Sequence, residues 1–215
     1  MTARRRAEVR RETKETKVRV AVDLDDASSR SIATGVGFFD HMLDALTLHA
    51  GIGVVIEAEG DLQVDQHHLV EDVGIALGSA LREALGTELK IARFGHAYAP
   101  LDDALARAVV DISGRAYLGF GVEISRAKVG DFDTELVEEF FRAFSSNARI
   151  NLHIDLLRGT NAHHQIEATF KACALALCAA LRVREGGAVP STKGALDEAQ
   201  ARGRASTRRR GKSSR

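Results

Sequence analysis

Residues 65–72 read DQHHLVED, and residues 161–168 read NAHHQIEA. Each copy contains the pattern HHxxE and opens a segment in which apolar residues recur with helical spacing. These residues are Val70, Val73, Leu77, Ala80, Leu81 and Ala84 in the first copy, and Ile166, Phe170, Cys173, Leu177 and Leu181 in the second. Both motifs are therefore predicted to lie in the first turn of a helix.

Within each motif the glutamate follows the first histidine by four residues, so these two side chains face one direction. The second histidine points about 100° away around the helix axis. Neighbouring imidazoles that diverge in this way are poorly placed to share one ion. The simplest interpretation is two metal sites, each taking the first His and the Glu from one copy and the second His from the other. The ligands would be His67, His68, Glu71, His163, His164 and Glu167.

The repeat extends beyond the two motifs. Residues 41–59 align without a gap beside residues 139–157, which pairs His41 with Glu139 and Ile52 with Ile150. Self-similarity of this length predicts a duplicated half-domain.

The pattern along the chain supports two similar halves. Alternating apolar residues predict a strand over 18–24, followed by a short strand over 31–34. Helical spacing then runs through His41, and a strand over 51–56 precedes the first HHxxE helix, which ends near Leu85. The second half repeats this order with strands over 106–112, 117–124 and 150–156 and helices over 136–144 and 163–181, and a strand over 96–99 is expected to bridge the halves. The expected fold is α+β, with two β-β-α-β-α half-domains packed helix to helix.

Composition bounds the domain organisation. We expect a flexible basic N-terminus over 1–10, a first half-domain over 11–95, a second over 96–196 and a disordered basic tail over 197–215. Residues 202–215 hold seven of the 30 basic residues and no acidic one, so the 23 basic and 30 acidic residues before them leave a net charge of −7. No stretch is apolar enough for a secretory signal or a membrane span, so a cytoplasmic protein is expected. The tail is interpreted as a solvated extension, and no nucleic-acid partner is expected.

Imidazole and carboxylate without thiolate suit Mn, Fe, Co or Zn, and more than four ligands favour Mn or Fe over tetrahedral Zn. Mn²⁺ is our first choice, with His41 and Glu139 as further ligands or, alternatively, as residues that only pack or cap. A second subunit could complete each site. A second group is suited to phosphate, because the arginine fork binds phosphate through two hydrogen bonds and lysine adds charge. This group comprises Arg93, Arg115, Lys171, Ser191 and Lys193.

Several longer motifs occur in a fixed order. They are TKET at 13–16, GVGFFDHML at 35–43, the two HHxxE copies, ISGR at 112–115 and PSTKG at 190–194. Together they resemble the imidazoleglycerol-phosphate dehydratase family over residues 11–196. That resemblance implies conversion of D-erythro-imidazole glycerol phosphate to imidazole acetol phosphate in L-histidine biosynthesis.

The resemblance also implies a fold like the second domain of ribosomal protein S5, two Mn²⁺ ions per active site, and a homo-oligomer of 24 subunits with sites between them. By position it implies the metal ligands His41, His67, His68, Glu71, His163, His164 and Glu167. It places Arg93, Arg115, Lys171, Ser191 and Lys193 on the phosphate, and Glu15, with Glu71 and Glu167, in the catalytic group. Many family members read Glu-His-Phe-Phe where this chain has Glu138-Glu139-Phe140-Phe141. A carboxylate therefore stands where an imidazole ligand often occurs.

The dehydration must remove a proton from a C–H bond that is barely acidic, and it must expel hydroxide, which is a poor leaving group. Two metals beside the imidazole would stabilise it as imidazolate. Its electrons would expel the adjacent hydroxyl to give a diazafulvene, and Glu15 would take the next proton. Two other functions fit the ligands alone: a dinuclear metallohydrolase of a phosphorylated substrate, and a metal-assembled scaffold whose basic tail binds nucleic acid.

Overall fold

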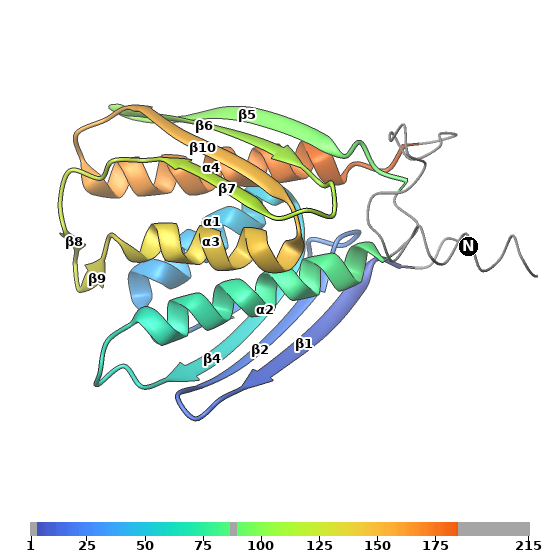
Figure 1. Cartoon of the computed structure of the whole chain (residues 1–215), viewed down its shortest axis with the longest axis horizontal. Helices are drawn as coiled ribbons and strands as arrows, with labels where there is room; N and C mark the ends of the chain where they lie inside the picture. The colour runs from blue at the N-terminus through green and yellow to red at the C-terminus, as the bar shows by residue number, and fades with distance from the viewer. Residues whose placement is uncertain (1–3, 87–89, 185–215) are drawn as a thin grey trace, which may run out of the picture.

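The computed structural model describes residues 4–86 and 90–184 (Figure 1). Ser191, Lys193 and the basic tail lie outside these residues. Within them, no helix combines the length and the apolar character needed to cross a bilayer.

The first half is one four-stranded sheet with two helices. It consists of β1 (Arg6–Glu12), β2 (Thr16–Asp23), β3 (Arg30–Ala33), α1 (Gly37–Ala50), β4 (Gly53–Gly60) and α2 (His67–Leu85). The sheet order is β1-β2-β4-β3, in which β3 runs parallel to β4 and the other pairs are antiparallel. Residues of β2 alternate in burial, so Val18, Val20 and Val22 face the helices while the residues between them face solvent.

The second half repeats this order. It consists of β5 (Phe94–Leu101), β6 (Ala104–Asp111), β7 (Tyr117–Gly121), α3 (Leu136–Ala148), β10 (Asn151–Arg158) and α4 (Ala162–Leu181). A small hairpin, β8 (Lys128–Val129) and β9 (Phe132–Asp133), is inserted between β7 and α3. The sheet order β5-β6-β10-β7 matches that of the first sheet strand for strand, and β7 runs parallel to β10 as β3 does to β4. The predicted α+β fold with duplicated halves is confirmed.

Each half nevertheless starts with an edge strand that the expected order lacks. Residues 6–10, expected to be flexible, belong to β1, which pairs with β2 along its whole length. The strand predicted over 96–99 is part of β5, which pairs with β6 inside the second half and does not bridge the two. Both expectations were wrong. In β1 only Ala7 and Val9 are apolar among charged residues, so alternation alone could not identify this strand.

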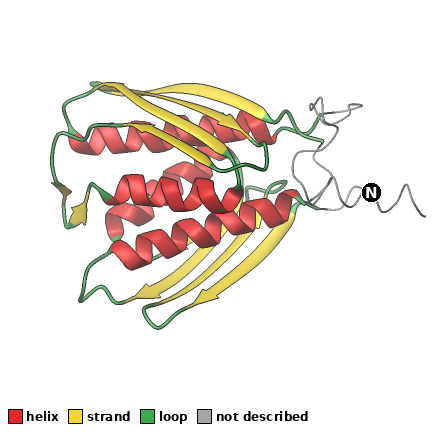
Figure 2. Cartoon of the chain, viewed as in Figure 1, coloured by secondary structure: helices red, strands yellow, loops and turns green. Residues whose placement is uncertain are grey.

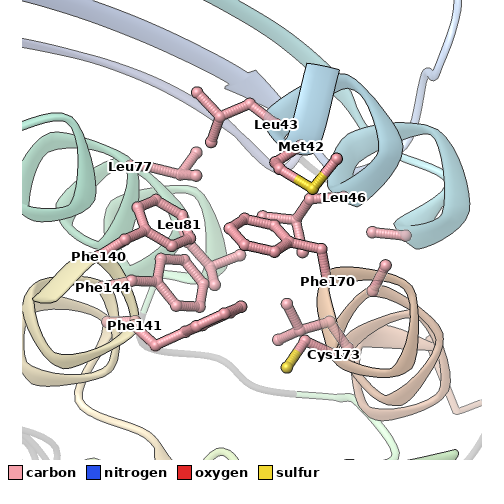
Figure 3. Close-up of a cluster of buried hydrophobic side chains, with 14 of the residues drawn as sticks. Met42, Leu43, Leu46, Leu77, Leu81, Phe140, Phe141, Phe144, Phe170 and Cys173 are labelled. Carbon is pink, nitrogen blue, oxygen red and sulfur yellow. The ribbon is translucent and has the colours of Figure 1, made fainter. Parts of the chain in front are cut away.

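The helices lie between the two sheets, and the sheets form the outer layers (Figures 1 and 2). Each long helix packs on its own sheet, α2 on β1 and β2 and α4 on β5 and β6, and each also contacts the short helix of the other half, α3 or α1. Phe140, Phe144 and Phe170 meet at the centre of this helical layer and are almost fully buried (Figure 3). The two halves therefore share one core, as predicted.

The contact between α2 and α3 depends on two glycines. A methyl group at Gly74 would lie 2.9 Å from the carbonyl oxygen of Phe140, and one at Gly78 would lie 2.5 Å from that of Phe144. Both distances are too short for carbon against oxygen, so the backbones of these helices approach more closely than side chains would permit. This close approach fixes where the start of α2 lies relative to α3.

Gly78→Ala should therefore lower the free energy of unfolding by about 1–3 kcal/mol, because overpacking outweighs the roughly 1 kcal/mol by which alanine favours a helix. Gly37→Ala is the matched control, since nothing lies within 4 Å of the added methyl group at the start of α1. Thermal unfolding of the two variants measures the difference. A Gly78→Ala protein as stable as the control would contradict the close packing.

Candidate metal site

Both HHxxE motifs lie in the first turn of a helix, as predicted. Asn161 caps α4, because its side-chain oxygen accepts hydrogen bonds from the backbone N–H groups of His163 and His164. At α2, the side chain of Asp65 accepts one from the backbone N–H of His67. The two helices start at the same end of the molecule, at the left in Figure 1. The fold therefore gathers both motifs at one end.

Three of the expected ligands converge. Nε2 of His163 lies 3.1 Å from Oε2 of Glu167, and Nε2 of His41 lies 3.3 Å from the same oxygen. His163 and Glu167 are one helical turn apart on α4, and His41 comes from α1, which packs against α4. All three ligand atoms lie within 4.8 Å of one another. Two imidazoles and a carboxylate in this arrangement could hold a divalent cation, and such N/O donors suit Mn²⁺.

Lys171 also belongs to this group. Its Nζ lies 2.6 Å from Oε1 of Glu167, the carboxylate oxygen that the histidines do not contact. Burial raises the pKa of Glu167, but the hydrogen bond and charge of Lys171, together with the hydrogen bonds from His163 and His41, outweigh it and hold the pKa below its ordinary value. Glu167 is therefore ionised, as a metal ligand must be.

The second histidine of each motif points to a different carboxylate. Nδ1 of His164 lies 2.7 Å from Oδ1 of Asp103, and Nδ1 of His68 lies 3.1 Å from Oδ2 of Asp61. The hydrogen bond to Asp61 raises the pKa of His68, and the hydrogen bond from His164 is the largest cause of the lowered pKa of Asp103. An ionised carboxylate only accepts, so Nδ1 is the donor, which leaves Nε2 as the atom that can bind a cation.

The first copy is less convergent than the second. Across residues 4–86 and 90–184, His67, Glu71 and Glu139 do not come together in a group like that of His41, His163 and Glu167. Glu139 lies on the first turn of α3, where its carboxylate is 4.0 Å from Nε of Arg142. Because α3 packs against α2 as α1 packs against α4, Glu139 lies on the helix that packs against the first motif's helix, as His41 lies on the helix that packs against the second motif's helix.

Glu15 lies in the turn between β1 and β2, at the same end of the molecule. Its Oε2 is 4.0 Å from Nδ1 of His68, and its side chain is 55% exposed. The corresponding turn between β5 and β6 carries Asp103, the partner of His164. The two halves therefore each present an acidic turn residue to the second histidine of their own motif.

Arg93 and Arg115 lie at the opposite end. The backbone N–H of Arg93 donates to the carbonyl of Ala180 at the C-terminal end of α4, whereas His163 is in its first turn. With a rise of about 1.5 Å per residue, the span from His163 to Ala180 is about 25 Å. Arg115 precedes β7, whose first residue pairs with the first residue of β10, so it lies at the same far end. Arg93 there forms an ion pair with Asp111 and lies over the ring of Phe94.

Sequence reasoning missed the carboxylates that orient the histidines. In the sequence, Asp103 belongs to an acidic turn and Asp61 lies a few positions before the first motif. Neither position indicates a contact with a histidine. The repeat offered a signal, because Asp103 stands where Glu15 stands in the first half. A pocket of about 440 Å³ beside His163, lined in part by Arg126, Lys128 and Thr160, was also not anticipated.

Asp103→Asn should weaken Mn²⁺ binding about 10- to 100-fold, because losing the carboxylate that orients a histidine ligand has that effect in metal sites. Asp26→Asn is the control, since that carboxylate is 39% exposed and pairs with Arg4 beyond the ends of β1 and β2 that lie away from the motifs. Electron paramagnetic resonance of free Mn²⁺ during titration measures both variants. Equal affinities would show that Asp103 does not orient a ligand.

Known proteins resemble this chain closely in sequence and in fold. The model of the family described as imidazoleglycerol-phosphate dehydratase matches residues 34–177. The dehydratases of Methylobacillus flagellatus and Halorhodospira halophila are each 55% identical to the chain, over 91% and 90% of its length and 100% of theirs. The crystal structure from Staphylococcus aureus is 48% identical, covers 83% of the chain and 99% of its own, and superposes with a TM-score of 0.76. The crystal structure from Pyrococcus furiosus, in complex with (S)-C348, is 41% identical and superposes with a TM-score of 0.77. It covers 87% of the chain and 100% of its own. The chain belongs to the imidazoleglycerol-phosphate dehydratase family.

Proposed function

We propose that the chain dehydrates imidazole glycerol phosphate to imidazole acetol phosphate, the activity that its relatives' names describe, in histidine biosynthesis. Membership of the family makes it a hydro-lyase. The observation that carries the proposal is the convergence of His41, His163 and Glu167 in one group of cation ligands. An azole substrate offers ring nitrogens that can bind the same cations as these imidazoles.

We propose Mn²⁺ as the cofactor, with two ions per active site. His163, Glu167 and His41 would hold one of them, and the oriented Nε2 atoms of His68 and His164 would supply further ligands. When bound, the ions act as Lewis acids that favour the deprotonated imidazole ring. Glu71 and His67 of the first HHxxE copy are proposed as ligands together with Glu139 of α3, where a carboxylate suits a hard cation.

Glu15 is proposed as the base that removes a proton from carbon. Once the ring has lost its N–H proton, it would expel the hydroxyl of the adjacent carbon as hydroxide, which leaves with that proton as water. The diazafulvene so formed would have an acidic C–H bond at the next carbon. The carboxylate of Glu15 would take this C–H proton, a proton would return to the ring nitrogen, and the resulting enol would become the ketone by proton transfer to carbon. Exposure of Glu15 at the end of the molecule that carries both motifs supports this role, because a substrate can reach it there.

We infer that each active site is shared between copies of the chain. The two arginines proposed to bind phosphate lie about 25 Å from His163 along α4, far beyond the length of a three-carbon phosphate ester. The two arginines must therefore come from another subunit if they and the metal ligands serve one substrate, whereas Lys171, the third residue proposed to bind phosphate, lies beside Glu167 of the same chain. This supports the proposed homo-oligomer, for which 24 subunits are expected.

Incubating the purified protein with Mn²⁺ and imidazole glycerol phosphate tests the function. We expect formation of the ketone, detected as its enolate absorbance in alkali, and no inorganic phosphate. Released phosphate would instead favour the metallohydrolase. Assembled and Mn²⁺-loaded protein that gives no ketone would overturn the proposed activity.

A further inference from the structure

A buried carboxylate follows the first HHxxE motif. Asp72 is only 5% exposed, and its side chain is bound by residues of β1 and β2. Nε of Arg11 donates to its Oδ1 over 2.7 Å, and the hydroxyl of Thr16 donates to its Oδ2. Asp72 thus ties the start of α2 to the turn that joins β1 and β2.

That turn carries Glu15. The hydroxyl of Thr13 accepts hydrogen bonds from the backbone N–H groups of Glu15 and Thr16, at 3.1 and 3.0 Å, and lies 3.2 Å from the hydroxyl of Thr16. The N–H of Thr13 donates in turn to the carbonyl of Thr16. The Glu15 side chain is more than half exposed, so the position of its carboxylate depends on this backbone.

The second half folds without such a link. The residue of α4 that corresponds to Asp72 is Ala168, and the corresponding turn is held through Asp103, which accepts from the N–H groups of Thr160 and Asn161. The same topology therefore does not require a buried carboxylate at this position. The link occurs in the half that carries Glu15.

We propose that Asp72, with Thr16 and Arg11, is a positioning group that holds Glu15 in place for proton transfer. The proposal rests on the proposed function, in which Glu15 removes a proton from carbon. Proton transfer requires the carboxylate within hydrogen-bonding reach, and a displacement of about 1 Å can lower the rate about 100-fold. Releasing the turn from α2 permits such a displacement without removing any group that contacts the substrate or the metal.

Thr16→Val removes the hydroxyl and keeps the shape of the side chain. In the full-length, Mn²⁺-loaded protein we expect kcat to fall about 30- to 100-fold, with KM and Mn²⁺ affinity within about twofold of wild type. Thr16→Ser, which restores the donor to Asp72, should recover most of kcat. A role in stability alone would not separate kcat from KM in this way.

Thr47→Val is the matched control, because Thr47 is fully buried on α1 and its hydroxyl donates only to the carbonyl of Asp44. Its kcat should equal that of wild type. If Thr16→Val does not assemble, Arg11→Ala decides, since it removes the other donor to Asp72 from a side chain that is 37% exposed, and it should lower kcat about tenfold or more. Assembled Thr16→Val or Arg11→Ala protein with unchanged kcat would overturn the positioning role. Inactive wild-type protein would instead show that the proposed function fails.

Discussion

Mixing His163→Ala subunits with Arg93→Ala subunits should restore activity that neither variant has alone. His163 belongs to the proposed metal site, and Arg93 is one of the residues proposed to bind the phosphate. About 25 Å of helix separates them within one chain. If one substrate contacts both groups, they come from different subunits. In a random equimolar mixture, about one quarter of the sites would then pair an intact metal site with an intact arginine.

The measurement compares the mixture, dissociated and reassembled with Mn²⁺, with each variant treated alone. Because Arg93 has a left-handed φ of 73° and an ion pair with Asp111, replacing it also affects the local fold. Arg115→Ala therefore provides a second partner for His163→Ala, since Arg115 lies at the same end of the sheet. The control mixture is His163→Ala with Glu167→Gln, whose changes fall in one site and cannot complement. Failure of both arginine variants to complement would place the phosphate elsewhere.

The duplicated fold could be predicted because both halves carry strong periodic signals at matching positions. The alternation of Val18, Val20 and Val22 and the helical spacing after each HHxxE motif reflect burial on one face, which sequence records directly. Strand β1 was not predicted, because it lies at the edge of its sheet and its charged residues face solvent. Its pairing with β2 depends on backbone hydrogen bonds, which leave little trace in residue type.

The candidate site was predictable only in part. The four-residue spacing of His163 and Glu167 fixes their common direction on a helix, and the structure brings them together as expected. Spacing along the sequence could not show that His41 joins His163 and Glu167, because this depends on how α1 packs against α4 of the other half. The roles of Asp61, Asp103 and Asp72 depend likewise on contacts between segments that lie far apart along the chain or on opposite sides of a turn.

Glu15→Gln should lower kcat about 1,000-fold, within the range that a positioned general base contributes. The substitution preserves the size of the side chain and removes its ability to accept a proton at neutral pH. Because the side chain is more than half exposed and lies 4.0 Å from His68, its loss should leave assembly and thermal stability unchanged.

Glu12→Gln provides the matched control for this prediction. Glu12 ends β1 beside the same turn, is 73% exposed and lies 3.7 Å from Lys17, so the same chemical change there should leave kcat as in wild type. Mn²⁺ affinity measured on both variants separates proton transfer from metal binding, because Glu15 is not among the proposed ligands. A Glu15→Gln protein that binds Mn²⁺ normally and keeps full kcat would require another base. A protein that loses Mn²⁺ together with activity would instead make Glu15 part of the metal site, through its approach to His68.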